Sequence, residues 1–113
     1  MPGDDPVRGD IYHIKFPTPV GPHYAIVVTA DAINRASDTV LVATITTQGV
    51  ERIYPHEFKV PNGLLPKPSK VKCHSIIMLE KQELTATNYV DTIYKRDMQG
   101  LDLALLKTFH LWL

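Results

Sequence analysis

A single run of sequence decides the fold class: Thr39-Val-Leu-Val-Ala-Thr-Ile-Thr-Thr47. β-Branched side chains fill most of this run, and such residues favour strands because they pack well on a pleated surface. Its length is that of a strand buried inside a sheet. We therefore expect a β-rich protein built around this strand.

Other segments extend the sheet on both sides of this run. Further strands are expected at Tyr24–Thr29, Ser69–Leu79 and Tyr89–Tyr94. Arg52–Val60 contains Pro55 and is expected to form an edge or bulged strand, because proline cannot donate a backbone hydrogen bond to a neighbouring strand. The alternation from Asp10 to Phe16 predicts a strand half exposed to water. Its two faces are Tyr12, Ile14 and Phe16, and Ile11, His13 and Lys15.

Helix is expected mainly after the last proline. All nine prolines lie at or before Pro68, and proline is excluded from helix interiors. From Asp97 onward, apolar residues recur at spacings of three and four, which predicts a helix with one buried face: Met98, Leu101, Leu105, Phe109 and Trp112. A shorter helix of one or two turns is expected within 31–37, capped by Thr29 or Asp31.

Composition sets broad limits on function. The chain has 113 residues, which predicts one domain over residues 1–113. Twelve basic and twelve acidic residues cancel, so no global field attracts it to nucleic acid or membrane. The single cysteine, Cys73, excludes an internal disulfide and suits a reducing compartment. No apolar run approaches a membrane helix, and the acidic, proline-containing start is unlike a signal peptide. A cytoplasmic protein is expected.

Three motifs in order carry a family resemblance. They are Arg8-Gly9-Asp10-Ile11-Tyr12, then Asn34-Arg35 followed by 39–48, and finally Cys73-His74-Ser75-Ile76 with Leu79-Glu80-Lys81 and Leu84. In this order and spacing the chain resembles the MazF/PemK (Kid) family of toxin ribonucleases over nearly its whole length.

The resemblance implies a fold, an activity and partners. The fold would be mainly β, an SH3-like antiparallel barrel of about five to seven strands with a C-terminal α-helix. The activity would be metal-independent, sequence-specific cleavage of single-stranded RNA by the toxin of a type II toxin–antitoxin system. The partners would be mRNA, a cognate antitoxin and a second copy of the chain, with DNA reached only through the antitoxin. No cofactor is implied.

Such a nuclease needs three kinds of group. A base takes the proton of the ribose 2′-hydroxyl, an acid protonates the leaving 5′-oxygen, and donors stabilise the phosphoryl oxygens. Carried over by position, the family's third-strand Ser or Thr is Thr46, and its later-strand charged pair falls on Lys72 and His74. The family's Arg-Pro pair falls on His23-Tyr24, so an imidazole, which titrates near neutral pH, replaces a guanidinium.

RNA binding is indicated by local charge. Five basic residues lie between Arg52 and Lys72 against one acidic residue, Glu57, with aromatic residues between them. Lysines can follow phosphates and aromatic rings can stack on unpaired bases, although such a charge run is often only a solvated loop. The expected RNA-binding residues are Lys15, Thr47, Gln48, Arg52, Tyr54, Lys59, Lys67 and Lys70.

Each of these residues also has a purely structural interpretation. Thr46 is a common strand residue, His23 follows a proline-rich loop, and Lys72 and His74 share a face that can simply be solvated. The five histidines lack the spacing of a metal site, so no metal is expected. Two other functions stay open: a DNA gyrase poison like the CcdB family, suggested by Trp112, and an inactive member that only binds antitoxin.

Overall fold

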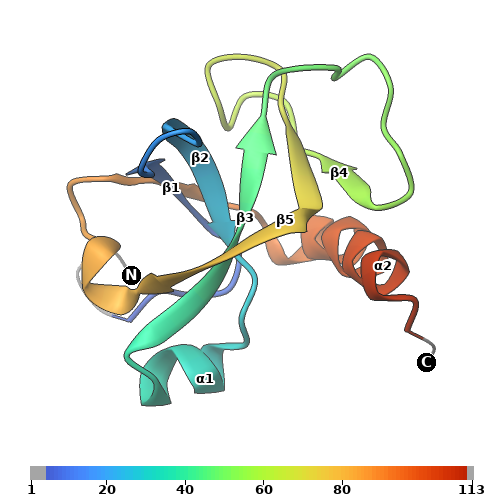
Figure 1. Ribbon diagram of the computed structural model, residues 1–113. Helices are drawn as coiled ribbons and strands as arrows, with labels where there is room; N and C mark the ends of the chain where they lie inside the picture. The colour runs from blue at the N-terminus through green and yellow to red at the C-terminus, as the bar shows by residue number, and fades with distance from the viewer. Residues whose placement is uncertain (1–4, 112–113) are drawn as a thin grey trace.

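The computed structural model describes residues 5–111, and within them six strands form one strongly curved antiparallel sheet (Figure 1). The spatial order is β4-β5-β3-β2-β1-β6, so the strand at Thr39–Thr46 lies inside the sheet as expected. The strands are β1 Asp10–Lys15, β2 Pro22–Val27, β3 Thr39–Thr46, β4 Glu57–Lys59, β5 Lys70–Glu80 and β6 Tyr89–Thr92. The helices are α1 Asp31–Ala36 and α2 Met98–Phe109, with short 3-10 turns η1 Lys81–Glu83 and η2 Lys95–Asp97.

Both faces of the sheet are buried near its centre. One face packs with α2 and includes Ile11, Ile26, Ala43 and Val71. The other includes Tyr12, Ala25, Val42 and Leu79, closed by Leu84 after η1. The expectation that Ile11 lies on a water-exposed face is therefore wrong, because Ile11 is fully buried on the face of the sheet that packs with α2. Only His13 and Lys15 on that face reach solvent, because the helix covers just part of the sheet.

The segment Arg8-Gly9-Asp10 ties the start of β1 to distant elements. The Arg8 guanidinium donates a hydrogen bond to the carbonyl of Val28 at 2.8 Å and forms an ion pair with Asp102 of α2 at 2.7 Å. The buried Asp10 carboxylate accepts a hydrogen bond from the hydroxyl of Thr92 in β6 at 2.7 Å. The first sequence motif, which begins at Arg8, therefore has a structural role, because it connects elements that are far apart in the sequence.

Asn34 gives the second motif a similar structural role. Its fully buried amide donates to the carbonyl of Thr29 at 3.0 Å and accepts from the Thr29 hydroxyl, while its own carbonyl accepts from Lys81 Nζ at 2.8 Å. The expected cap is wrong: the N-cap of α1 is Ala30, without a side-chain hydrogen bond, and Asp31 is the first helical residue. Thr29 cannot cap α1 in this arrangement because its hydroxyl is turned to Asn34.

The helix α2 forms where its periodicity predicts. Met98 and Leu101 of the expected buried face are buried, and Leu105 is half-buried. Phe109 is instead 56 % exposed, because the last turn of α2 runs past the sheet (Figure 1). Trp112, the last residue of the expected face, lies outside the described residues.

Candidate active site

Three strand ends meet at one end of the sheet. β2 begins, β3 ends and β5 begins toward the top of Figure 1, near the loops that join β1 to β2 and β4 to β5. These strand ends carry His23, Thr46 and Lys72, three of the four residues expected to be catalytic. All three side chains are partly exposed to solvent.

Strand register puts the three side chains on the same face. Ala25 pairs with Thr44, and Thr44 pairs with Lys72, so these three residues share a face. His23 and Thr46 lie two residues from Ala25 and Thr44 along their strands, and alternate residues of a strand point to the same side. The buried second core therefore continues outward into a polar patch at this end of the sheet.

The imidazole of His23 is held by backbone. Its Nδ1 lies 3.2 Å from the carbonyl oxygen of Ile45, the residue before Thr46. Since a carbonyl can only accept, Nδ1 carries the proton in this contact and Nε2 is the nitrogen that can take one. The ring is thus oriented in the way a general base requires.

The hydroxyl of Thr46 is oriented by the turn that follows β3. Its Oγ1 accepts a hydrogen bond from the backbone N–H of Gln48 at 3.0 Å. A hydroxyl can accept and donate together, so this bond fixes the oxygen while leaving its proton for an anionic acceptor. Thr46 can therefore serve as a phosphoryl-oxygen donor.

A bulge in β5 separates His74 from the other three. Between Ala43 and Thr44 the register jumps from Ile76 to Lys72, which leaves three residues of β5 outside the regular pairing. His74 lies in this bulge, is exposed, and contacts the ring of His56 edge-on at 4.9 Å between centroids. β3 lies between the strands that carry His23 and His74, so the two imidazoles are on opposite sides of Thr46.

The expected RNA-binding residues divide by exposure. Seven are exposed. Five of them lie between the end of β3 and the end of β4, and the other two are in β1 and in the loop between β4 and β5: Thr47, Gln48, Arg52, Tyr54, Lys59, then Lys15 and Lys67. Lys70 is only 5 % exposed. Its ammonium forms a 2.8 Å ion pair with Glu57 and donates to the carbonyl of Arg52 at 3.0 Å. This geometry does not suit a phosphate contact, so we remove Lys70 from the proposed RNA-binding set.

Glu57 is the buried partner of Lys70. Burial raises the pKa of its carboxyl, but hydrogen bonds from Lys70 and from the backbone N–H of Tyr54 more than offset this and hold the pKa below its usual value. The same oxygen, Oε1, accepts from both donors at 2.8 and 3.0 Å. The carboxylate therefore links β4, β5 and the turn before β4.

His56 is the residue that sequence reasoning left aside. Its ring stacks on Tyr54 at 6.0 Å between centroids with 22° between the planes, and the guanidinium of Arg52 lies 4.8 Å from the centre of the Tyr54 ring. The signal was the spacing of two between Arg52, Tyr54 and His56, because residues two apart in an extended chain share a side.

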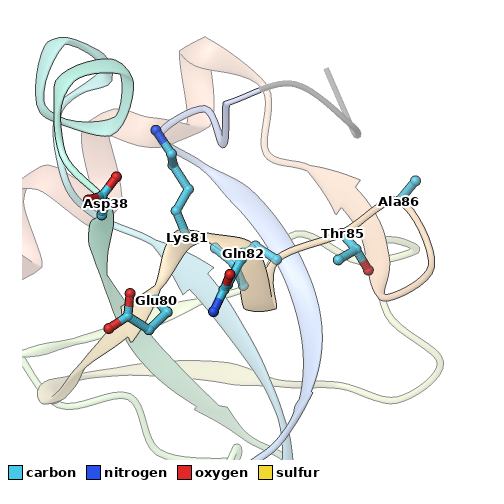
Figure 2. A pocket seen from close by; sticks show the side chains of 7 residues that line it. Asp38, Glu80, Lys81, Gln82, Thr85 and Ala86 are labelled. Atoms are coloured by element: carbon cyan, nitrogen blue, oxygen red, sulfur yellow. The ribbon is translucent and has the colours of Figure 1, made fainter.

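Other groups among the described residues are less suited to catalysis or ligand binding. Across 5–111 no three His, Cys, Asp or Glu side chains converge as a metal site, and no helix is long and apolar enough to cross a membrane. Cys73 is buried, which raises the pKa of its thiol to about 11 and makes it a poor nucleophile. A cavity of about 550 Å³ lies at the far ends of β3 and β5, where Figure 2 shows Lys81 extending away from Glu80. The Lys81 ammonium is already paired with Asp5.

The chain matches a protein family over almost its whole length. Residues 7–109 fit the sequence model of the family described as PemK-like, MazF-like toxin of type II toxin-antitoxin system. The chain belongs to this family. No curated protein sequence matches it.

Solved structures agree with the PemK/MazF-like fold. An endoribonuclease from a mycobacterial species superposes with a TM-score of 0.80 at 23 % identity, covering 98 % of both chains. A mycobacterial endoribonuclease in complex with its cognate antitoxin gives 0.79 at 25 % identity, covering 96 % of this chain and 98 % of that one. The Mycobacterium tuberculosis toxin MazF-mt6 gives 0.77 at 20 % identity, covering 92 % and 99 %. The expected fold, a curled antiparallel sheet with a C-terminal helix, is confirmed.

Membership also fixes the class of function. As a PemK/MazF-like toxin, the chain is a toxin component of a type II toxin–antitoxin system. The resemblance seen in the sequence motifs is therefore confirmed.

Proposed function

We propose that this PemK/MazF-like toxin is a metal-independent endoribonuclease that cuts single-stranded RNA through the ribose 2′-hydroxyl. The observation that carries the proposal is the presence of His23, Thr46 and Lys72 on one face at one end of the sheet. This patch combines an imidazole that can accept a proton, a hydroxyl donor and a cation, which are groups that the reaction needs.

In the proposed reaction, His23 Nε2 takes the proton of the 2′-hydroxyl. The 2′-oxygen then bonds to the adjacent phosphorus, and the bond from phosphorus to the 5′-oxygen breaks. His74, on the other side of Thr46, gives its proton to the departing 5′-oxygen. The products are a 2′,3′-cyclic phosphate and a 5′-hydroxyl, so no water or metal is consumed. Thr46 donates to a phosphoryl oxygen and Lys72 offsets the charge that develops there.

The proposed partners follow the same surface. An acidic segment of the antitoxin would lie over the exposed basic residues between Arg52 and Lys72 and block the RNA path. One of the solved relatives is a complex with its cognate antitoxin, which supports such a partner. Two copies of the toxin would pair through the apolar surface of α2.

The decisive experiment is RNA cleavage in the presence of EDTA. Purified toxin is incubated with a mixed single-stranded RNA, and the products are analysed for cyclic phosphate ends; gyrase supercoiling is measured in parallel. Cleavage with cyclic ends and active gyrase is the expected result. Intact RNA with inhibited gyrase would replace the proposal by a gyrase poison, and intact RNA with active gyrase by an inactive antitoxin-binding protein.

A further inference from the structure

Four flat side chains form a continuous row beside the candidate active site. Arg52 lies over the Tyr54 ring at 4.8 Å, Tyr54 stacks on His56 at 6.0 Å, and His56 meets His74 edge-on at 4.9 Å. Three of the four are exposed, and Tyr54 retains 44 % of its accessible surface. The row therefore exposes parts of its side chains to solvent from the turn before β4 to the bulge of β5, while Arg52 and His56 cover part of the Tyr54 ring.

The turn that carries this row is fixed from below by a buried ion pair. Lys70 Nζ donates to the Arg52 carbonyl and to Glu57, whose carboxylate accepts from the Tyr54 N–H. Lys70 also lies 5.6 Å from the centre of the Tyr54 ring. A buried ion pair is a weak source of stability, because desolvation cancels much of the attraction. Its clearest effect here is to hold the backbone of 52–57, and hence the rings, in one place.

We propose that Arg52, Tyr54, His56 and His74 form a base-stacking surface for unpaired RNA, and that the Lys70–Glu57 pair positions it. This inference rests on the proposed nuclease function and adds to it the residues that would hold the bases of the single-stranded substrate. Paired bases are already covered on both faces, so a duplex cannot use the row. Since the row ends at His74, bases that stack on it lead the backbone to the phosphate that is cut.

The test separates bases from phosphates with two uncleavable ligands. One is a single-stranded oligonucleotide with 2′-fluoro ribose, which lacks the attacking hydroxyl; the other is an abasic backbone of equal length. Affinities are measured by fluorescence anisotropy for the parent, Tyr54→Ala, His56→Ala and Tyr54→Phe. The matched control is Tyr94→Ala, because Tyr94 is also exposed and paired with an arginine, Arg96 at 5.5 Å, but follows β6 at the opposite edge.

The expected result is a loss that depends on the bases. Tyr54→Ala and His56→Ala weaken binding of the base-carrying oligonucleotide by roughly 5- to 100-fold, as removal of a stacking ring does. Neither changes affinity for the abasic backbone, and Tyr54→Phe and Tyr94→Ala bind both like the parent. Equal losses on both ligands, no loss on either, or a parent that does not prefer the base-carrying ligand would each overturn the stacking surface.

The positioning pair is tested by neutralising both charges. Lys70→Met with Glu57→Gln leaves every ring present and avoids an unpaired buried charge. If the pair positions the row, this variant folds like the parent by circular dichroism yet loses several-fold affinity for the base-carrying ligand only. Unchanged affinity would show that the rings need no such support. All these measurements use uncleavable ligands, so a failure of the nuclease proposal, seen as intact RNA in EDTA, is recorded separately.

Discussion

His23 carries the most distinctive chemistry at the scale of single residues, because the proposed mechanism makes it the general base. If His23 and His74 act as base and acid, one must be neutral and the other protonated, so cleavage should follow a bell-shaped pH profile. His23→Ala and His74→Ala should each lose about 10²–10⁴-fold in rate, and Thr46→Ala about 10²–10³-fold. Single-turnover cleavage from about pH 5 to 9 measures this. An unchanged rate in His23→Ala would show that His23 takes no part in the reaction.

Resemblance to the family placed His23, Thr46 and Lys72 in the candidate site. The structure brings together the strand ends that carry these three residues. Lys70 was misjudged as an RNA contact, because nothing local distinguishes a lysine that reaches a buried carboxylate from one in solvent. Its partners, Arg52 and Glu57, are brought to it by the turn before β4, and that contact exists only in the folded chain.

The Lys70–Glu57 pair joins two elements, β4 and β5, and should make stability depend on pH. Hydrogen bonding from Lys70 and Tyr54 outweighs burial and lowers the pKa of Glu57 below its ordinary 4.5. A carboxyl with a lower pKa in the folded state stabilises the fold at neutral pH, and this contribution is lost as pH falls from about 4.5 through the folded-state value. Breaking such a pair costs up to about 3–5 kcal/mol.

Urea unfolding of the parent and Glu57→Gln at about pH 7 and pH 3 measures this contribution. The variant should be less stable at neutral pH, and the difference should narrow as the pH falls, because protonation of the parent carboxyl makes the two proteins more alike. The other carboxyls are common to both proteins and cancel. An equal difference at the two pH values would contradict the assignment.

The packing of α2 on β4 makes a second prediction at this scale. A Cβ on Gly100 would lie 2.7 Å from Cε1 and 3.0 Å from Cδ1 of the half-buried Phe58 ring. Gly100→Ala gains at most about 1 kcal/mol of helix propensity, but displacing a packed ring costs about 1–3 kcal/mol. We expect a net destabilisation of about 1 kcal/mol by urea unfolding, with Gln99→Ala, at an exposed neighbour, close to neutral. A Gly100→Ala protein more stable than the parent would refute the contact.

Elements were predictable to the extent that their sequences carry a period. The β-branched run at Thr39 and the three-four spacing after Asp97 gave β3 and α2 nearly to the residue. β4 is shorter than the expected Arg52–Val60 strand, because only 57–59 pair with β5 and the preceding residues form the turn held by Lys70. The bulge in β5 has no local signature, since it arises from pairing with two partners at once.

At the scale of the whole molecule, charge is organised although its total is zero. Two exposed basic residues, Arg52 and Lys59, lie just before and within β4, the edge strand that pairs with β5, and β5 also carries Lys72. The acidic residues near the start of the chain serve the fold instead: Asp5 pairs with Lys81, and Asp10 is buried against Thr92. A neutral protein can therefore offer a local surface to an anionic strand.

Self-association is the last expectation at this scale. The later part of α2 and the residues that follow it expose Leu103, Phe109 and Leu111, each more than half accessible, and the small sheet leaves them uncovered. Pairing of this patch with itself about a two-fold axis would bury it. Light scattering at micromolar concentration should give twice 12.7 kDa. Phe109→Glu should shift the protein to a folded monomer, whereas Ile33→Glu, which places the same charge on exposed α1, should stay dimeric. A parent of 12.7 kDa, or a dimer unaffected by Phe109→Glu, would rule out this interface.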